Sequence, residues 1–309
     1  MLAASLMMIA ALTAAPQDRQ PRAPQTDETV SIPKGARLTI DNFAGEVVVK
    51  AWDRDSLRVQ ARHGSRARVN IRTTGSSVVV SAQQPTPSSV DYEITAPAWM
   101  PVKVVGTYNF ITIEGTQSEV SAETTRGDVI VRGGSGTVTA KSIQGEVIVE
   151  GARGRVIASS VNEGVRVSGA SGDISVETTN GDISLTQMKS QNVEASTING
   201  DIEFEGTAAD RGRYTFTTHN GDITIAVPES SNVSFSVRTY QGRFSPALNV
   251  SGPPRSEVRQ GRRTTYTLGT GSAEMELETF GGSIRLLPPS SFKSRTSSGK
   301  DKSKDPEKP

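Results

Sequence analysis

A short template recurs along most of this chain. In a typical copy an apolar residue, a spacer and a second apolar residue or Ala lead to Ser or Thr, then to Gly-Asp or Gly-Glu, and then to another alternating apolar pair. Val120-x-Ala122-x-Thr124 followed by Gly127-Asp128-Val129-x-Val131 is a clear example. Because internal repetition decides the architecture of a chain, this repeat constrains the fold more than any other feature of the sequence.

The copies keep a fixed internal register although their period varies. Seven consecutive copies begin at Val120, Val138, Val156, Ile174, Val193, Tyr214 and Phe235. Their spacings are 18, 18, 18, 19, 21 and 21 residues, yet the first apolar residue always lies 9 positions before the second pair. Inserted residues must therefore fall on the far side of each copy, away from the Gly-Asp turn.

The template extends beyond this regular block. Further copies begin at Leu38, Val69, Val102 and Met275, which gives eleven copies between residues 38 and 286. Irregular insertions occur near residues 50–68, 81–101 and 245–263. We therefore expect N-terminal β repeats with insertions over residues 30–101 and regular repeats over residues 102–287.

Alternation of apolar and polar residues within each copy is typical of a strand with one buried face. Two short strands per copy, joined by turns at Gly, predict an all-β fold, a β-solenoid resembling a single-stranded β-helix. In such a fold each strand pairs with its equivalent in the next turn, about 4.8 Å away. Small residues at the second inward position predict a thin interior: Ala122, Ala140, Ala158 and Ala195.

A meander of β-hairpins is the competing interpretation. The pair Asn-Gly at residues 180–181, 199–200 and 220–221 is a strong hairpin signal. However, the same position carries Arg126-Gly127 and Gln144-Gly145 in the most regular copies without any loss of register. This tolerance favours the solenoid.

Several segments resemble a known family. They are the recurrent Thr-x-Asn-Gly-Asp-Ile, the opening FAGEVVV at residues 43–49 with AWDR at 51–54, and YEITAP at 92–97. Together they are similar to the exported bacterial β-strand-repeat family labelled "putative adhesin", a domain of unknown function that resembles the adhesin head-like domains of autotransporters. The resemblance covers about residues 30–287. It implies an exported, solenoid-like repeat protein for which no catalytic residues are assigned.

Composition removes several classes of function. The chain has no Cys and only two His, so it cannot supply a thiolate nucleophile, a disulfide framework or a cysteine zinc site. A formal net charge of +1 gives no electrostatic reason to expect nucleic-acid binding. We expect neither an enzyme nor a bound cofactor.

The two ends of the chain differ from the repeats. Residues 1–15 are apolar, rich in Ala and end in small residues, which predicts a signal peptide too short to span a bilayer comfortably. Residues 16–29 predict a disordered, Pro-rich linker, and residues 288–309 a disordered basic tail. We expect an exported protein of the periplasm or cell exterior, with no transmembrane anchor.

Acidic residues recur at one position of the template, just after the turn Gly. If the turns stack, these carboxylates form a row whose members repel one another in water by about 1 kcal/mol per adjacent pair. Such a row is a candidate for Ca²⁺, which prefers carboxylate oxygens, but solvated carboxylates that accept turn hydrogen bonds are the favoured interpretation. The row consists of Asp128, Glu146, Asp182, Asp201 and Asp222.

Basic residues concentrate in the first insertion. Between residues 50 and 72 there are seven Lys or Arg against two Asp. Those that could lie on one strand face and bind a polyanion are Arg62, Arg66, Arg68 and Arg72. A solvated strand face is the simpler interpretation.

These features predict a non-enzymatic exported scaffold, an adhesin or an envelope-interaction protein whose partner is an envelope or surface component such as an anionic glycan or lipid. Two alternatives stay open. One is a carbohydrate-active β-helix enzyme, which would need clustered acidic residues at one groove. The other is a structural envelope-stress protein without a specific ligand.

Overall fold

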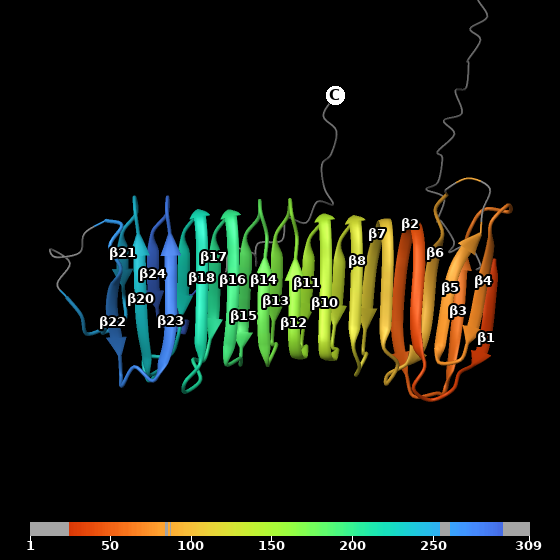
Figure 1. Ribbon diagram of the computed structural model, residues 1–309, viewed down its shortest axis with the longest axis horizontal. Helices are drawn as coiled ribbons and strands as arrows, with labels where there is room; N and C mark the ends of the chain where they lie inside the picture. Colours follow the sequence, from red (N-terminus) through yellow and green to blue (C-terminus); the bar gives the residue numbers. More distant parts are fainter. Residues whose placement is uncertain (1–24, 84–85, 87, 254–259, 293–309) are drawn as a thin grey trace, which may run out of the picture.

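The computed structural model describes residues 25–83, 86, 88–253 and 260–292, and these form a long β-solenoid. The predicted signal peptide (residues 1–15) and most of the predicted linker and tail lie outside the described residues. In Figure 1 the strands stand upright, side by side along the rod, with the N-terminal strands at one end and the C-terminal strands at the other. None of the described residues belongs to a helix long and apolar enough to cross a membrane.

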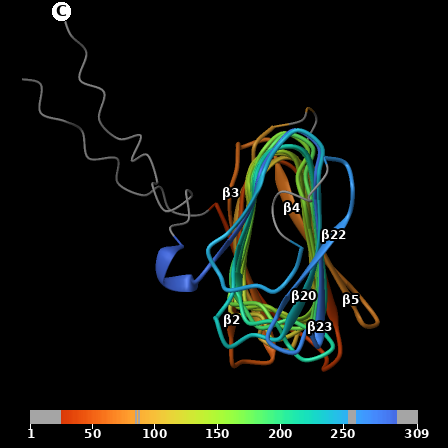
Figure 2. The same ribbon diagram turned by 90° about the vertical axis from the view of Figure 1, so that its left-hand side faces the viewer.

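Two walls of strands enclose the core. Viewed along the rod, the turns superpose into a narrow oval with one wall on each long side (Figure 2). The long strands β2 (Arg37–Trp52) and β7 (Val102–Glu114) pass around one corner and contribute to both walls.

The first wall consists, besides β2 and β7, of β4 (Arg68–Thr74), β5 (Ser77–Gln83), β8 (Val120–Arg126), β10 (Ser135–Gln144), β12 (Arg153–Ser159), β14 (Asp173–Glu177), β16 (Asn192–Asn199), β18 (Arg213–Asn220), β20 (Val233–Thr239), β22 (Thr264–Leu268) and β23 (Ala273–Thr279). The second wall consists of β1 (Thr26–Ser31), β3 (Ser56–Arg62), β6 (Asp91–Pro97), β9 (Val129–Arg132), β11 (Val147–Glu150), β13 (Val165–Ser168), β15 (Ile183–Met188), β17 (Ile202–Gly206), β19 (Ile223–Ala226), β21 (Phe244–Pro246) and β24 (Ile284–Leu287). A short 3-10 helix, η2 (Pro289–Ser291), follows the last strand.

Equivalent template positions lie directly over one another, which confirms the predicted solenoid. Val138 pairs in parallel with both Val120 and Val156, and Ile202 pairs with both Ile183 and Ile223. A hairpin meander would have paired neighbouring strands antiparallel, so that alternative is wrong for the regular block. The Asn-Gly pairs turn the corner between the two walls instead of closing hairpins.

The order of turns in space differs from their order in the sequence at both ends. The turn containing β2 lies between β5 and β7, because β3 to β6 fold back over the N-terminal end. At the other end Tyr214 pairs with Met275, and Phe235 pairs with Met275 from the opposite side. In space, the last turn of the sequence (β23 and β24) therefore lies between the turn of β18 and β19 and the turn of β20 and β21.

One predicted copy is not a turn of the solenoid. Val69 and Ile71 lie on β4, which forms an antiparallel hairpin with β5 instead of leading through a corner to Val78. Val78 instead begins a turn whose second strand is β6, where Tyr92 pairs with Val47. The predicted linker also ends sooner than expected, because Thr26–Ser31 form β1, which pairs antiparallel with β3.

Antiparallel strands cover the two ends of the rod. At the C-terminal end, β22 pairs antiparallel with β20. At the N-terminal end, β4 pairs antiparallel with β5, and β3 pairs antiparallel with both β1 and β6. Such strands break the parallel register that a further turn would need, and so protect the ends from open-ended stacking.

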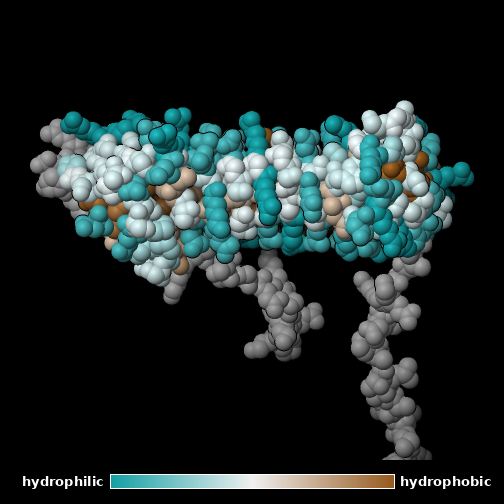
Figure 3. All heavy atoms as spheres, turned by 90° about the horizontal axis from the view of Figure 1, so that it is seen from below, coloured by the Kyte–Doolittle hydropathy of each residue, from teal (hydrophilic) through white to brown (hydrophobic). Residues whose placement is uncertain are grey.

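Inward side chains from the two walls fill the interior. Ala122, Ala140, Ala158 and Ala195 are at most 1% exposed, as the predicted thin core requires. Phe204 lies in the same turn as Ala195, and its ring centroid is 5.2 Å from that of Phe216. The large Phe204 side chain therefore fills the space that the small Ala195 leaves, which keeps the core close-packed. From below, the rod shows mostly hydrophilic and neutral side chains, with apolar atoms in small patches (Figure 3).

Close stacking at the corner excludes any side chain on the turn Gly. A Cβ added to Gly200 would lie 2.0 Å from the carbonyl oxygen of Gly181 in the preceding turn. We therefore expect Gly200→Ala to lower the free energy of unfolding by about 1–3 kcal/mol, because the two turns must move apart. Denaturant unfolding followed by circular dichroism measures this change.

Gly64→Ala is the matched control, because no atom lies within 4 Å of a Cβ placed there. An equal loss of stability in the two variants would contradict direct backbone contact between successive corners.

Candidate binding surfaces

Buried hydroxyl groups tie each corner to the preceding one. Ser142 Oγ donates to the carbonyl oxygen of Gly127 at 2.9 Å, and Ser160 Oγ donates to that of Gly145 at 2.9 Å. The same bond joins Thr197 to Gly181 at 3.1 Å. The hydroxyl position of the template therefore has a structural role, since a buried carbonyl needs a partner.

We expect Thr197→Val to lower the free energy of unfolding by about 1–3 kcal/mol, because it leaves the Gly181 carbonyl unsatisfied in a nearly isosteric site. Thr197→Ser keeps the hydroxyl and is the control. Thermal and denaturant melts measure both variants, and a loss in the Ser variant as large as that in the Val variant would argue against the hydrogen bond.

The predicted acidic row exists, and its oxygens bind the protein backbone. Asp128 Oδ1 accepts the amide of Glu146 at 2.8 Å, Asp182 Oδ1 that of Asp201 at 2.8 Å, and Asp201 Oδ1 that of Asp222 at 2.7 Å. Within the described part of the chain no three His, Asp or Glu side chains come close enough together to hold a metal ion. The geometry agrees with turn carboxylates that stabilise the stack.

Arginine side chains neutralise two members of the row. Arg166 lies 2.7 Å from Glu146, and Arg285 forms an ion pair with Asp222. Burial nevertheless raises the pKa of the Glu146 carboxyl above its ordinary value of 4.5, because Arg166 offsets the loss of solvent only in part.

This raised pKa makes a testable contribution to stability. The folded protein binds a proton at Glu146 more tightly than the unfolded chain does, so the free energy of unfolding falls as pH rises from 4.5 through the folded pKa. Glu146→Gln should remove this fall. Unfolding in urea over a pH series measures it, and identical pH profiles for the two proteins would contradict the assignment.

The structure divides the four predicted basic residues between the two walls. Arg62 ends β3 in the second wall, and its Nε lies 4.0 Å from Asp91 Oδ2. Arg66 lies in the turn before β4, while Arg68 and Arg72 are exposed on β4 in the first wall. None of these last three forms an ion pair with another described residue. Three guanidinium groups without an ion-pair partner among the described residues therefore lie along β4 and the turn before it, at the N-terminal end.

An exposed apolar row along the corner was not predicted. Its members follow the corner hydroxyl, or the equivalent residue in register, in several turns, while Thr125, Thr179 and His219 interrupt it at the same position in others. The large apolar members are 38–50% exposed: Phe43, Ile143, Val161, Ile198 and Phe280. The same template position could have shown it in the sequence. At its C-terminal end the His219 and Phe280 rings stack 4.8 Å apart, and Tyr240 lies 5.2 Å from Phe280.

A family model, Toastrack DUF4097, matches residues 35–287, which include every described strand except β1. The chain belongs to the Toastrack DUF4097 family. The match confirms the resemblance to a family of unknown function, and the solenoid is the form that the Toastrack repeat takes here. A search of the curated proteins finds no match.

Two solved structures are similar to this Toastrack chain. One is a "putative adhesin" from Parabacteroides distasonis, with 9% identity, a TM-score of 0.43, and coverage of 85% of this chain and 96% of that one. The other is a "putative cell adhesion protein" from Clostridium sporogenes, with 10% identity, a TM-score of 0.23, and coverage of 85% and 99%.

Proposed function

We propose that this protein is a non-enzymatic, exported scaffold that adheres to an anionic component of the cell envelope or surface. The observation that carries the proposal is the group of unpaired arginines at the N-terminal end of the rod. Arg66, Arg68 and Arg72 are exposed and have no ion-pair partner among the described residues, whereas Arg58 on the neighbouring wall is held by Asp27 at 2.7 Å.

The construction of the rod supports a binding role. Corner hydroxyls and carboxylates bind the adjacent turn, as Thr218 Oγ1 does with the Gly200 carbonyl at 2.9 Å. Outward-facing strand residues do not contact the core, so their identity can vary from turn to turn without changing the packing of the interior. A stack of this kind offers a long rigid surface on which charges can be placed at regular spacing.

Arginine suits an anionic partner because its planar guanidinium binds carboxylate and phosphate in a bidentate manner. On β4, Arg68 and Arg72 are four residues apart, so both side chains lie on the same outward face of the strand. An anionic glycan or a phospholipid surface matches this arrangement.

Binding to isolated cell envelopes tests the proposal. The double variant Arg68→Gln and Arg72→Gln should bind about three- to tenfold less at low salt, and the difference should shrink as salt rises. The matched control is Arg153→Gln with Arg155→Gln, two exposed arginines on the middle strand β12. Sedimentation of labelled protein with envelopes and with anionic or neutral vesicles measures the effect.

Failure of the wild-type protein to sediment with either envelopes or anionic vesicles would overturn the proposal. Release of reducing ends from an acidic polysaccharide by the wild-type protein would support a carbohydrate-active enzyme instead.

A further inference from the structure

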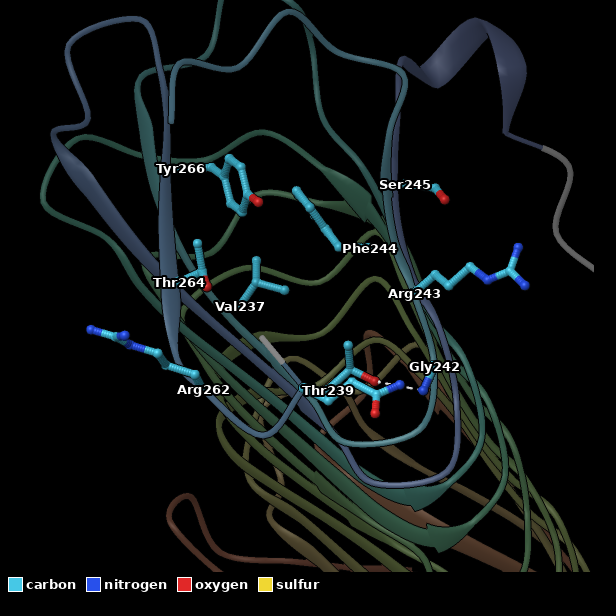
Figure 4. A pocket seen from close by; sticks show the side chains of 10 residues that line it. Val237, Thr239, Gly242, Arg243, Phe244, Ser245, Arg262, Thr264 and Tyr266 are labelled. Atoms are coloured by element: carbon cyan, nitrogen blue, oxygen red, sulfur yellow. Dashed lines mark hydrogen bonds between the residues drawn. The ribbon is translucent and has the colours of Figure 1, made fainter. Parts of the chain in front are cut away.

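A cavity opens at the C-terminal end of the rod. Its volume is about 370 Å³, within the usual range for small-molecule sites. It lies between the two walls where a further turn would stack, with β20 and β22 on one side and β21 on the other. Figure 4 shows the side chains of Phe244 and Tyr266 next to each other at this cavity.

The floor of the cavity is aromatic. The Phe244 and Tyr266 rings lie 4.5 Å apart at an angle of 34°, and Val237 lies beside them. Flat apolar rings bind the C–H faces of sugars as well as other apolar bodies. The polar side chains of Gln260 and Thr264 also line the cavity, and they can serve the hydroxyl groups of the same ligand.

Two arginines without carboxylate partners flank this floor. Four nearby arginines are neutralised: Arg238 by Glu278 at 3.4 Å, Arg213 by Glu274 at 3.9 Å, Arg263 by Glu276, and Arg285 by Asp222. In contrast, Arg243 and Arg262 form no ion pair with any described residue, and no carboxylate is among the described residues that line the cavity. Among the described lining residues, the positive charge is therefore uncompensated.

The guanidinium groups lie on opposite rims and extend outward from the cavity in Figure 4. Both side chains are exposed and make no hydrogen bond with another described residue. Rotation about their side-chain torsions toward the mouth would therefore break no existing contact, and rotamer changes of exposed side chains are fast. The backbone places the two side-chain stems on either side of the mouth.

From these contacts we propose that the terminal cavity binds an acidic sugar, a uronic acid at the end of a glycan chain. The ring of the sugar packs on Phe244, which the buried Tyr266 ring supports from behind, and its carboxylate pairs with Arg243 and Arg262. This inference rests on the proposed adhesive function and names a ligand for it, at the end of the rod opposite the β4 arginines. It involves no covalent step.

Calorimetric titration and saturation-transfer NMR with the full chain test the site. Glucuronic acid should bind, whereas glucose and the methyl ester of glucuronic acid should bind much more weakly because they lack the charge. Arg243→Gln or Arg262→Gln should each weaken binding about tenfold, the effect of losing one charge-assisted hydrogen bond. Phe244→Leu keeps the apolar volume and should weaken all the sugars through loss of the ring face.

Arg153→Gln, on β12 in the middle of the rod, is the matched control and should leave binding unchanged. Thermal melts of every variant separate loss of the site from loss of the fold. An oligosaccharide with glucuronate at its non-reducing end should bind at least as well as the free sugar; a site that takes only the free sugar would refute the chain-end assignment.

Absence of glucuronate binding, or equal binding of glucose, would overturn the inference. This outcome is distinct from failure of the proposed function, because envelope binding through the β4 arginines is measured separately and can persist without the terminal site.

Discussion

The parallel register between successive turns is the constraint on which the rest of this structure depends. Each strand pairs with its equivalent in the next turn, as Val147 does with Val129 and Val165. Because side chains alternate across a strand, a slip of one residue would move every inward valine to the surface. The corner Gly, the corner hydroxyl and the corner carboxylate all act to keep neighbouring turns in this register.

Much of the fold could be predicted from the sequence because the template states the register directly. The spacing of 9 residues between the apolar pairs is the same in every regular copy, and the structure turns it into two facing walls. The order of the terminal turns could not be predicted in this way. Copies that share one template can stack in any order, so only the lengths and contacts of the connecting segments place Met275 beside Tyr214.

The candidate sites were predictable to different degrees. The acidic row follows from the template, and its hydrogen bonds to the next amide follow once the turns stack. The four arginines do not share a face, because β3 and β4 belong to different walls, and a sequence pattern within one insertion carries no information about that division. The terminal cavity depends on contact between Phe244 and Tyr266, which lie 22 residues apart in the sequence and on different walls. The template does not predict this contact.

The reversed order of the last two turns has a consequence for how the chain reaches its native state. During synthesis from the N-terminus, β18 and β19 can dock on the preceding turn as soon as they are made. The solenoid can therefore grow turn by turn up to that point. The next segment, β20 and β21, has no docking surface until β23 and β24 have been synthesised and placed against β18 and β19. Completion of the rod therefore awaits synthesis of β23 and β24, which imposes a long-range closure step on an otherwise locally assembled protein.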